Sequence, residues 1–207
     1  MRAAILEYDN RKIAGTLLFL GGIQWFFVIL IAEGLHPGYN SGVHYVSSLG
    51  VGATSHFYNP SVFLLGVTII TGAYLIQHAL GHRLFFVLFT ITGLATMGVG
   101  LFPENVRPMH GIVTPIALLF GGLSTIMSYK LQKPPLSYIS VLLGAMSLAA
   151  GVLFNPYLGL PRESLKTYLG LGKGTMERII IYPILLWVIS FGSQLTVSKY
   201  DRHINPP

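Results

Sequence analysis

The chain has 207 residues, of which 52% are hydrophobic and only 10% are charged. A soluble domain carries roughly 25% charged residues, so this composition excludes a water-soluble globule and indicates an integral membrane protein. The formal net charge of +6 is explained by Lys and Arg in short loops that orient membrane spans, and it does not point to nucleic acid as a partner.

The N-terminal sequence MRAAILEYDNRKIAGTLLFL leads into the first long apolar run. This run is too long for the hydrophobic region of a signal peptide, and it shows no clear small-residue cleavage site. We therefore expect a retained membrane span at Ile13–Ala32.

Five further stretches reach the roughly 20 mostly apolar residues that a helix needs to cross a bilayer. They are Ser61–Leu80, Leu84–Phe102, Ile112–Lys130, Leu136–Phe154 and Ile179–Ser198. Only helices and closed barrels satisfy backbone hydrogen bonds in lipid, and apolar runs without alternation indicate helices. The prediction is an all-α integral membrane protein, with residues 1–207 forming a single domain that is a bundle of six transmembrane helices.

Lys and Arg are more numerous on one side of this arrangement. With the N-terminus inside, the inner segments hold Arg2, Arg11, Lys12, Arg83, Lys130, Lys133, Lys199 and Arg202. The outer loops hold Arg107, Arg162, Lys166, Lys173 and Arg178. The positive-inside rule therefore predicts cytoplasmic N and C termini and a multi-pass protein of the cell membrane.

The first outer loop, Glu33–Pro60, contains no Lys or Arg. Its second part, VHYVSSLGVGATSHFYNP, has no charged residue at all but holds two histidines and several hydroxyls. The apolar spacing of Val43, Val46 and Leu49 favours a short amphipathic turn or a re-entrant segment packed on the helices. A mobile loop is the alternative interpretation.

The turn LFPENVRPMHG between the third and fourth spans is framed by Pro103 and Pro108, which make it short and rigid. It brings together an acid, a cation and a base, namely Glu104, Arg107 and His110. These residues are candidates for a functional site. The plainer interpretation is a salt-bridged loop whose histidine bonds a neighbouring backbone group.

The sequence GKGTMERIII opens the last span. Thr175 is the predicted N-cap, which places Glu177 in the first turn, where a negative charge is favourable. A cation is unfavourable there, so Arg178 needs a partner: Glu104, Glu177 or an anionic lipid headgroup. Snorkelling of the Arg178 side chain to the headgroup region is the alternative.

A metal site and a nucleophile are weaker candidates on the same side. The potential zinc ligands are His36, His44, His56 and His110, with an oxygen from Glu33 or Glu104. No recognised metal-binding spacing supports zinc, so no cofactor is expected. Ser47 and Ser48 lie near His44 in the sequence, but the chain lacks the G-x-S-x-G, H-E-x-x-H and P-loop motifs, and turn or cap roles explain both serines more simply.

Three motifs carry a resemblance to a known family: SSLGVG in the first loop, GVGLFPENVRPMHG between spans three and four, and GTMERIIIYPILLW at the start of span six. In these motifs and their order, the chain resembles the six-span membrane family catalogued as domain of unknown function 998, which is similar in turn to membrane proteins of the DRAM and Frag type. The resemblance implies six spans, cytoplasmic termini and a role in membrane trafficking or lipid organisation. The family usually has an acidic residue before its Leu-Gly, where this chain has Ser48, so a catalytic acid at this position is not supported.

We consider three functions, of which the first two use the polar outer face. The first is a non-enzymatic protein that binds lipid headgroups or a protein partner through a polar pocket, with Arg107 and Arg178 meeting phosphate. The second is an intramembrane lipid-modifying enzyme, such as a hydrolase that uses a metal or a water; an accessory subunit of a membrane complex is a third. The predicted site comprises His44, Ser47, Ser48, His56, Glu104, Arg107, His110, Glu177 and Arg178.

Overall fold

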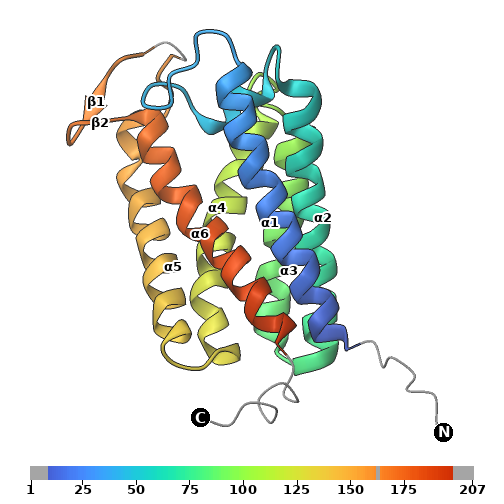
Figure 1. The fold of residues 1–207 in the computed structure, drawn as a ribbon. Coiled ribbons are helices and arrows are strands. Elements are labelled where there is room, and N and C mark those ends of the chain that lie inside the picture. The colour runs from blue at the N-terminus through green and yellow to red at the C-terminus, as the bar shows by residue number, and fades with distance from the viewer. Residues whose placement is uncertain (1–8, 162–163, 198–207) are drawn as a thin grey trace, which may run out of the picture.

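The computed structural model describes residues 9–161 and 164–197, and these residues form the predicted six-helix bundle (Figure 1). The long helices are α1 (Asn10–Leu35), α2 (Ser55–Leu80), α3 (Arg83–Leu101), α4 (Met109–Met127), α5 (Leu136–Leu153) and α6 (Lys173–Thr196). All of them are long and apolar enough to cross a membrane. The short elements are the 3-10 helices η1 (Val46–Gly50), η2 (Ser128–Leu131) and η3 (Asn155–Tyr157), and an antiparallel hairpin of β1 (Thr167–Tyr168) and β2 (Leu171–Gly172).

Several helix boundaries differ from the predicted ones. Helix α1 continues to Leu35, so Glu33 belongs to the helix and not to the loop. Helix α6 begins at Lys173 with Gly172 as its N-cap, so the prediction of an N-cap at Thr175 is wrong. The predicted bounds follow apolar composition, so they leave out the helical turns near the membrane surface that consist of polar and charged residues. The predicted last residue of the sixth span, Ser198, lies outside the described residues.

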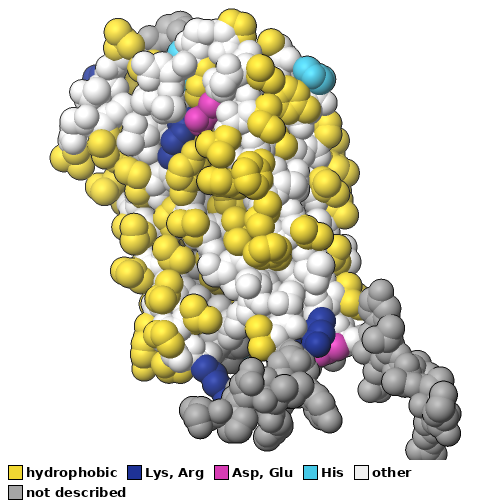
Figure 2. Space-filling model, in the orientation of Figure 1, with side chains coloured by type: hydrophobic (Ala, Val, Ile, Leu, Met, Phe, Trp, Pro, Cys, Tyr) yellow, Lys and Arg dark blue, Asp and Glu magenta, His cyan; other side chains and the backbone are white. Residues whose placement is uncertain are grey.

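Both ends of the described chain lie at the same end of the bundle, because the Arg11 Nη2 donates to the Val197 carbonyl at 2.6 Å. We call this the terminus end. The opposite end, which we call the loop end, carries residues 36–54, the 102–108 turn and the hairpin (Figure 1). Figure 2 shows charged side chains near the two ends and hydrophobic side chains along the flank, as expected for a protein surrounded by lipid.

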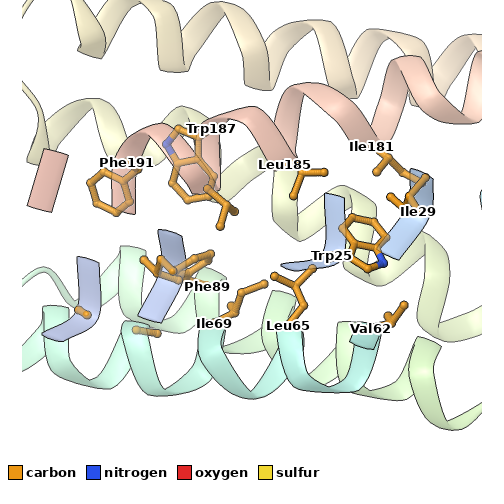
Figure 3. Packing of buried hydrophobic residues seen from close by; sticks show 14 of the residues in the cluster. Trp25, Ile29, Val62, Leu65, Ile69, Phe89, Ile181, Leu185, Trp187 and Phe191 are labelled. Carbon is orange, nitrogen blue, oxygen red and sulfur yellow. The ribbon is translucent and has the colours of Figure 1, made fainter. Parts of the chain in front are cut away.

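Aromatic side chains fill the centre of the bundle toward the terminus end (Figure 3). The rings of Trp187 and Phe191 of α6 stack at 5.3 Å, and Phe89 of α3 meets Trp187 edge-on at 5.4 Å. The Trp187 indole N–H donates to the Ser128 hydroxyl at 2.8 Å, so this ring is buried without an unsatisfied donor.

Small residues let the helices approach closely. A Cβ on Gly15 of α1 would lie 2.6 Å from the Gly192 carbonyl oxygen of α6, and a Cβ on Gly144 of α5 would lie 2.7 Å from that of Gly122 in α4. Such contacts matter in lipid, where van der Waals packing drives helix association. Helices α4 and α5 are therefore held together at the level of Gly122 and Gly144.

The cytoplasmic placement of the terminus end stays a prediction, and cysteine labelling tests it. The chain has no cysteine, so Ala53→Cys at the loop end and Lys133→Cys at the terminus end each introduce one thiol at an exposed position. We expect a membrane-impermeant maleimide to label Ala53→Cys in intact cells and Lys133→Cys only after permeabilisation. The reverse pattern would show that the bias of Lys and Arg does not orient this protein.

Candidate functional site

Helix η1 lies inside the loop end of the bundle, and all five of its residues are buried. Val46 and Leu49 are fully shielded from solvent within the apolar core. The packed-segment interpretation of this charge-free stretch is confirmed: it is a short helix seated among α1, α2 and α6. A segment without Lys, Arg, Asp or Glu enters the bundle at little electrostatic cost.

The Glu177 carboxylate holds the start of η1. The Val46 backbone N–H donates to Glu177 Oε2 at 2.5 Å, and the Ser47 N–H also donates to this side chain. The first N–H groups of a helix have no partner within the helix, so a carboxylate at this place satisfies them with charge-assisted bonds. Glu177 is only 5% exposed, and its role is that of an N-cap supplied from a distant part of the chain.

Ser48 and Glu104 connect η1 to the turn between α3 and α4. The Ser48 hydroxyl donates to Glu104 Oε2 at 2.6 Å, and both side chains are buried. A serine at this position therefore complements the Glu104 carboxylate. An acidic residue would place a second carboxyl group against it, and one of the two would have to be protonated.

His110 bonds the same turn from the beginning of α4. Its Nδ1 lies 2.7 Å from the Phe102 carbonyl, and because a carbonyl only accepts, this nitrogen carries the proton. In the neutral ring Nε2 is then the acceptor, and the Thr114 hydroxyl lies 3.2 Å from it. The interpretation of His110 as a histidine bonded to a neighbouring backbone group is confirmed.

Arg178 points to a different part of the loop end, and the prediction that Glu104 or Glu177 pairs with it is wrong, while a lipid headgroup as a partner stays a prediction. Its guanidinium forms an ion pair with Glu33 Oε1 at 2.5 Å and not with Glu104 or Glu177. We call the group around it the Arg178 latch. The other acceptors of the guanidinium in this latch are the Tyr39 hydroxyl at 2.6 Å and the carbonyls of Ser41, His44 and Gly174 at 2.7, 3.4 and 2.9 Å.

Helix geometry explains why Glu177 and Arg178 separate. Successive residues of an α-helix point about 100° apart, so Glu177 faces η1 while Arg178 faces α1 and residues 39–44. Burial raises the pKa of Tyr39 above its ordinary value, so its hydroxyl stays protonated and donates to the Tyr45 carbonyl at 2.9 Å. The latch thus fastens the first loop to α6 beside the Glu177 contact.

Six of the nine predicted site residues line no shared pocket. Ser48 and Glu104 bond each other and Arg178 belongs to the latch, and the other three are His44, His56 and Arg107. His44 is half-buried, accepts the Asn40 N–H at Nδ1 and meets Arg178 through its backbone. His56 is exposed in the first turn of α2, against the ring of Phe57, and Arg107 is exposed on the turn between α3 and α4. Among the described residues, no three His, Asp or Glu side chains gather closely enough to hold a metal ion.

A cavity of about 630 Å³ opens at the loop end between α4, α5 and α6. Its polar end is formed by Ser47, His110 and Glu177, so the structure brings these three predicted residues together. The sequence analysis missed the walls, most of which come from predicted spans. They are Tyr45, Gly111, Thr114, Pro115, Leu118, Leu119, Ser147, Leu148, Gly151, Val152, Phe154, Asn155, Leu158 and Ile180.

The cavity opens sideways. Leu119 of α4 and Val152 of α5 line it and are 50% and 77% exposed on the flank of the bundle, where a membrane protein meets lipid. Pro115 lacks the N–H that would bond the Gly111 carbonyl one turn before it, and both residues line the cavity. A proline within a predicted span was the available sequence signal for this interruption of α4.

A smaller cavity of about 80 Å³ adjoins the first toward the centre of the bundle. Ser47, Thr114, Leu118 and Glu177 line both cavities. Its walls include Trp25, Val62, Leu65 and Ile181, whose packing Figure 3 shows. The carboxylate of Glu177 therefore lies between a lateral opening and the core.

A model of the DUF998 family, described as proteins of unknown function, matches residues 19–194. No curated protein and no solved structure matches the chain. The similarity to DRAM- and Frag-type proteins stays a prediction.

The Arg178 latch can be tested by a conservative substitution. Arg178→Lys keeps the charge but removes the forked donors that reach Glu33, Tyr39 and the loop carbonyls, so we expect a loss of about 2 kcal/mol in the free energy of unfolding. Equilibrium unfolding in detergent micelles measures it. Arg107→Lys, at an exposed position, is the matched control and should change stability by less than about 0.5 kcal/mol. Equal effects of the two substitutions would contradict a structural role of the latch.

Proposed function

The chain belongs to the DUF998 family, and we propose that it binds a membrane lipid in the lateral cavity between α4, α5 and α6. The observation that carries this proposal is a cavity with apolar walls, an opening on the lipid-facing flank and a buried carboxylate at its inner end. Its volume of about 630 Å³ falls within the range of roughly 300–1,000 Å³ that is usual for small-molecule sites.

The walls suit an acyl chain. The lining residues of α4 and α5 are largely apolar and include Leu118 and Leu148. Leu119 and Val152 line the cavity and are exposed on the flank. A lipid tail can enter sideways from the bilayer without crossing a polar layer. Contact with these side chains exchanges one apolar environment for another, so the specificity of binding has to come from the polar end.

The polar end favours a headgroup that donates hydrogen bonds and carries no negative charge. None of the lining residues is Lys or Arg, and Glu177 supplies a carboxylate. His110 Nδ1 is already bonded to Phe102, and Pro115 leaves the Gly111 carbonyl without its helical donor. A hydroxyl or ammonium group finds acceptors here, whereas a phosphate would face the carboxylate without a compensating cation.

This proposal changes the roles expected for the two arginines. Neither Arg107 nor Arg178 lines the cavity, and the Arg178 guanidinium is engaged in the latch. Recognition of a phosphate by this pair is therefore not part of the proposed function. The six apolar helices support a multi-pass membrane protein, and we propose the cell membrane as its location.

Hydrolysis is the second candidate. A hydrolase needs a nucleophile with its base in hydrogen-bond reach inside the pocket. The Thr114 hydroxyl and His110 Nε2 lie 3.2 Å apart and both line the cavity, whereas Ser48 donates to Glu104 and does not line it. We favour binding because the chain lacks the G-x-S-x-G and H-E-x-x-H motifs of hydrolases. A protein partner and an accessory subunit of a complex stay alternatives, which co-purification of a second chain would favour.

Blocking the cavity should abolish lipid binding. Gly151 lines the cavity and a Cβ there would meet no atom within 4 Å, so we choose Gly151→Phe to place a ring at the cavity. Native mass spectrometry of the detergent-purified protein should show at least a tenfold weaker affinity for monoolein in the variant. Gly34→Phe is the matched control, because Gly34 is equally unobstructed and lies on α1, away from the cavity. Equal monoolein binding by both variants would sink the proposed site.

The headgroup preference provides a second test with three amphiphiles of the same chain length. We expect the protein to bind monoolein and oleylamine and to bind oleic acid at least tenfold more weakly, a difference of about 1.4 kcal/mol. Glu177→Gln keeps an acceptor for the Val46 N–H but removes the charge, so it should weaken oleylamine binding and leave monoolein binding within about threefold. Oleic acid bound as tightly as oleylamine by the wild-type protein would contradict the assigned polarity of the cavity.

A further inference from the structure

The hairpin of β1 and β2 exposes apolar side chains where a soluble turn would be polar. Leu165 is 76% exposed and Leu169 is 67% exposed, and the ring of Tyr168 is partly exposed beside them. Contiguous exposed apolar side chains of this kind mark contacts with membranes or proteins. They belong to none of the interactions described for the cavity or the latch.

The tip of the hairpin retains a leucine against the preference of its backbone. Tyr168 pairs with Leu171, which leaves a two-residue turn of Leu169 and Gly170, with φ of 54° and 74°. A two-residue turn with positive φ at both positions favours Asn-Gly, and the left-handed region is unfavourable for a bulky side chain such as Leu. The apolar side chain at the tip is therefore not explained by the turn.

The hairpin is held in place from below. The hydroxyl of the buried Tyr157 lies 3.0 and 2.9 Å from the carbonyls of Tyr168 and Leu171 and accepts the Tyr168 N–H at 3.2 Å. These contacts bind both strands to η3, at the end of α5. The exposed leucines are thus presented by a braced element.

The position of the hairpin matches the edge of the membrane. Figure 1 shows it projecting sideways from the loop ends of α5 and α6, and Figure 2 shows hydrophobic side chains along the same edge and down the flank. Val152 near the end of α5 and Leu158 after η3 are also strongly exposed, and both line the opening of the cavity. Lys166 is exposed beside the leucines, where its ammonium group can reach lipid headgroups.

We propose that the β1–β2 hairpin is an interfacial anchor: Leu165, Tyr168 and Leu169 insert into the headgroup region of the leaflet at the loop end, next to the opening of the cavity. The partner is the bilayer surface, because the exposed apolar side chains continue the lipid-facing surface of α5. Tyr at the boundary of the hydrocarbon region and Lys at headgroup level are the residues expected at such a depth. This inference does not depend on a lipid occupying the cavity.

Depth-dependent quenching tests the anchor, and the absence of native cysteine makes single labelling straightforward. Leu169→Cys carries an NBD fluorophore in the full chain, reconstituted into phosphatidylcholine vesicles at less than one protein per vesicle. Ala53→Cys, exposed in the first loop at the same end of the bundle, is the matched control. Quenching of the fluorophore by iodide, which is present on both sides of the bilayer, is compared with quenching by lipids that carry a nitroxide at the headgroup.

We expect iodide to quench the label at position 169 at least threefold less than the label at position 53, and the nitroxide lipid to quench it at least threefold more. Equal quenching by iodide at both positions would overturn the anchor. A parallel sample contains several copies of the protein per vesicle. Protection of position 169 from iodide in that sample alone would also overturn the anchor, because a second copy of the protein would then be what covers the hairpin.

A second variant separates an anchor from a mere turn. Leu169→Asn relieves the backbone preference, so it should not lower the melting temperature in detergent. If the hairpin is an anchor, the same substitution should at least double iodide quenching of a label at Leu165→Cys. An unchanged quenching ratio at position 165, with the hairpin still folded, would contradict insertion of the tip.

Discussion

The contact between the Glu177 carboxylate and the start of η1 is the constraint on which the loop end depends. A short helix inside a membrane bundle brings unpaired N–H groups into a region without water, and each would carry the full penalty of a buried unsatisfied donor. Glu177 satisfies the N–H groups of Val46 and Ser47 from α6. The first loop can therefore lie within the bundle, and its buried end becomes the inner wall of a cavity.

Glu177 and Arg178 are adjacent in α6 but make different contacts. Glu177 is occupied by η1 and borders both cavities, while Arg178 is turned toward Glu33 and the loop carbonyls. An acid that caps a helix and still faces a cavity can act on a ligand without a separate binding residue. The Arg178 guanidinium is bound within the latch and does not line the cavity, so it is not placed to bind a ligand there. The chemistry of the proposed site is for this reason that of an acceptor.

The packing between α4 and α5 determines where a lipid can reach the Glu177 carboxylate from the bilayer. Gly122 and Gly144 allow backbone contact on one level, whereas nearer the loop end a Cβ on Gly111 or Gly151 would meet no atom within 4 Å, and both glycines line the cavity. The hairpin beside this opening is braced by Tyr157. Cavity, opening and hairpin thus lie at one edge of the molecule, which we propose to be where lipid headgroups meet acyl chains.

The sequence by itself determined the number, order and type of the spans and favoured a packed segment at η1, because length, apolar composition and missing charge are local properties of the chain. It also indicated that Arg178 needs a partner and that Ser47, His110 and Glu177 belong to the polar face. Only the tertiary structure decided that the partner is Glu33, that Arg107 and His56 stay outside, and that α4 and α5 enclose a cavity. Adjacent helical residues point about 100° apart, so the neighbour that each one meets is set by how distant helices pack, which no local pattern records.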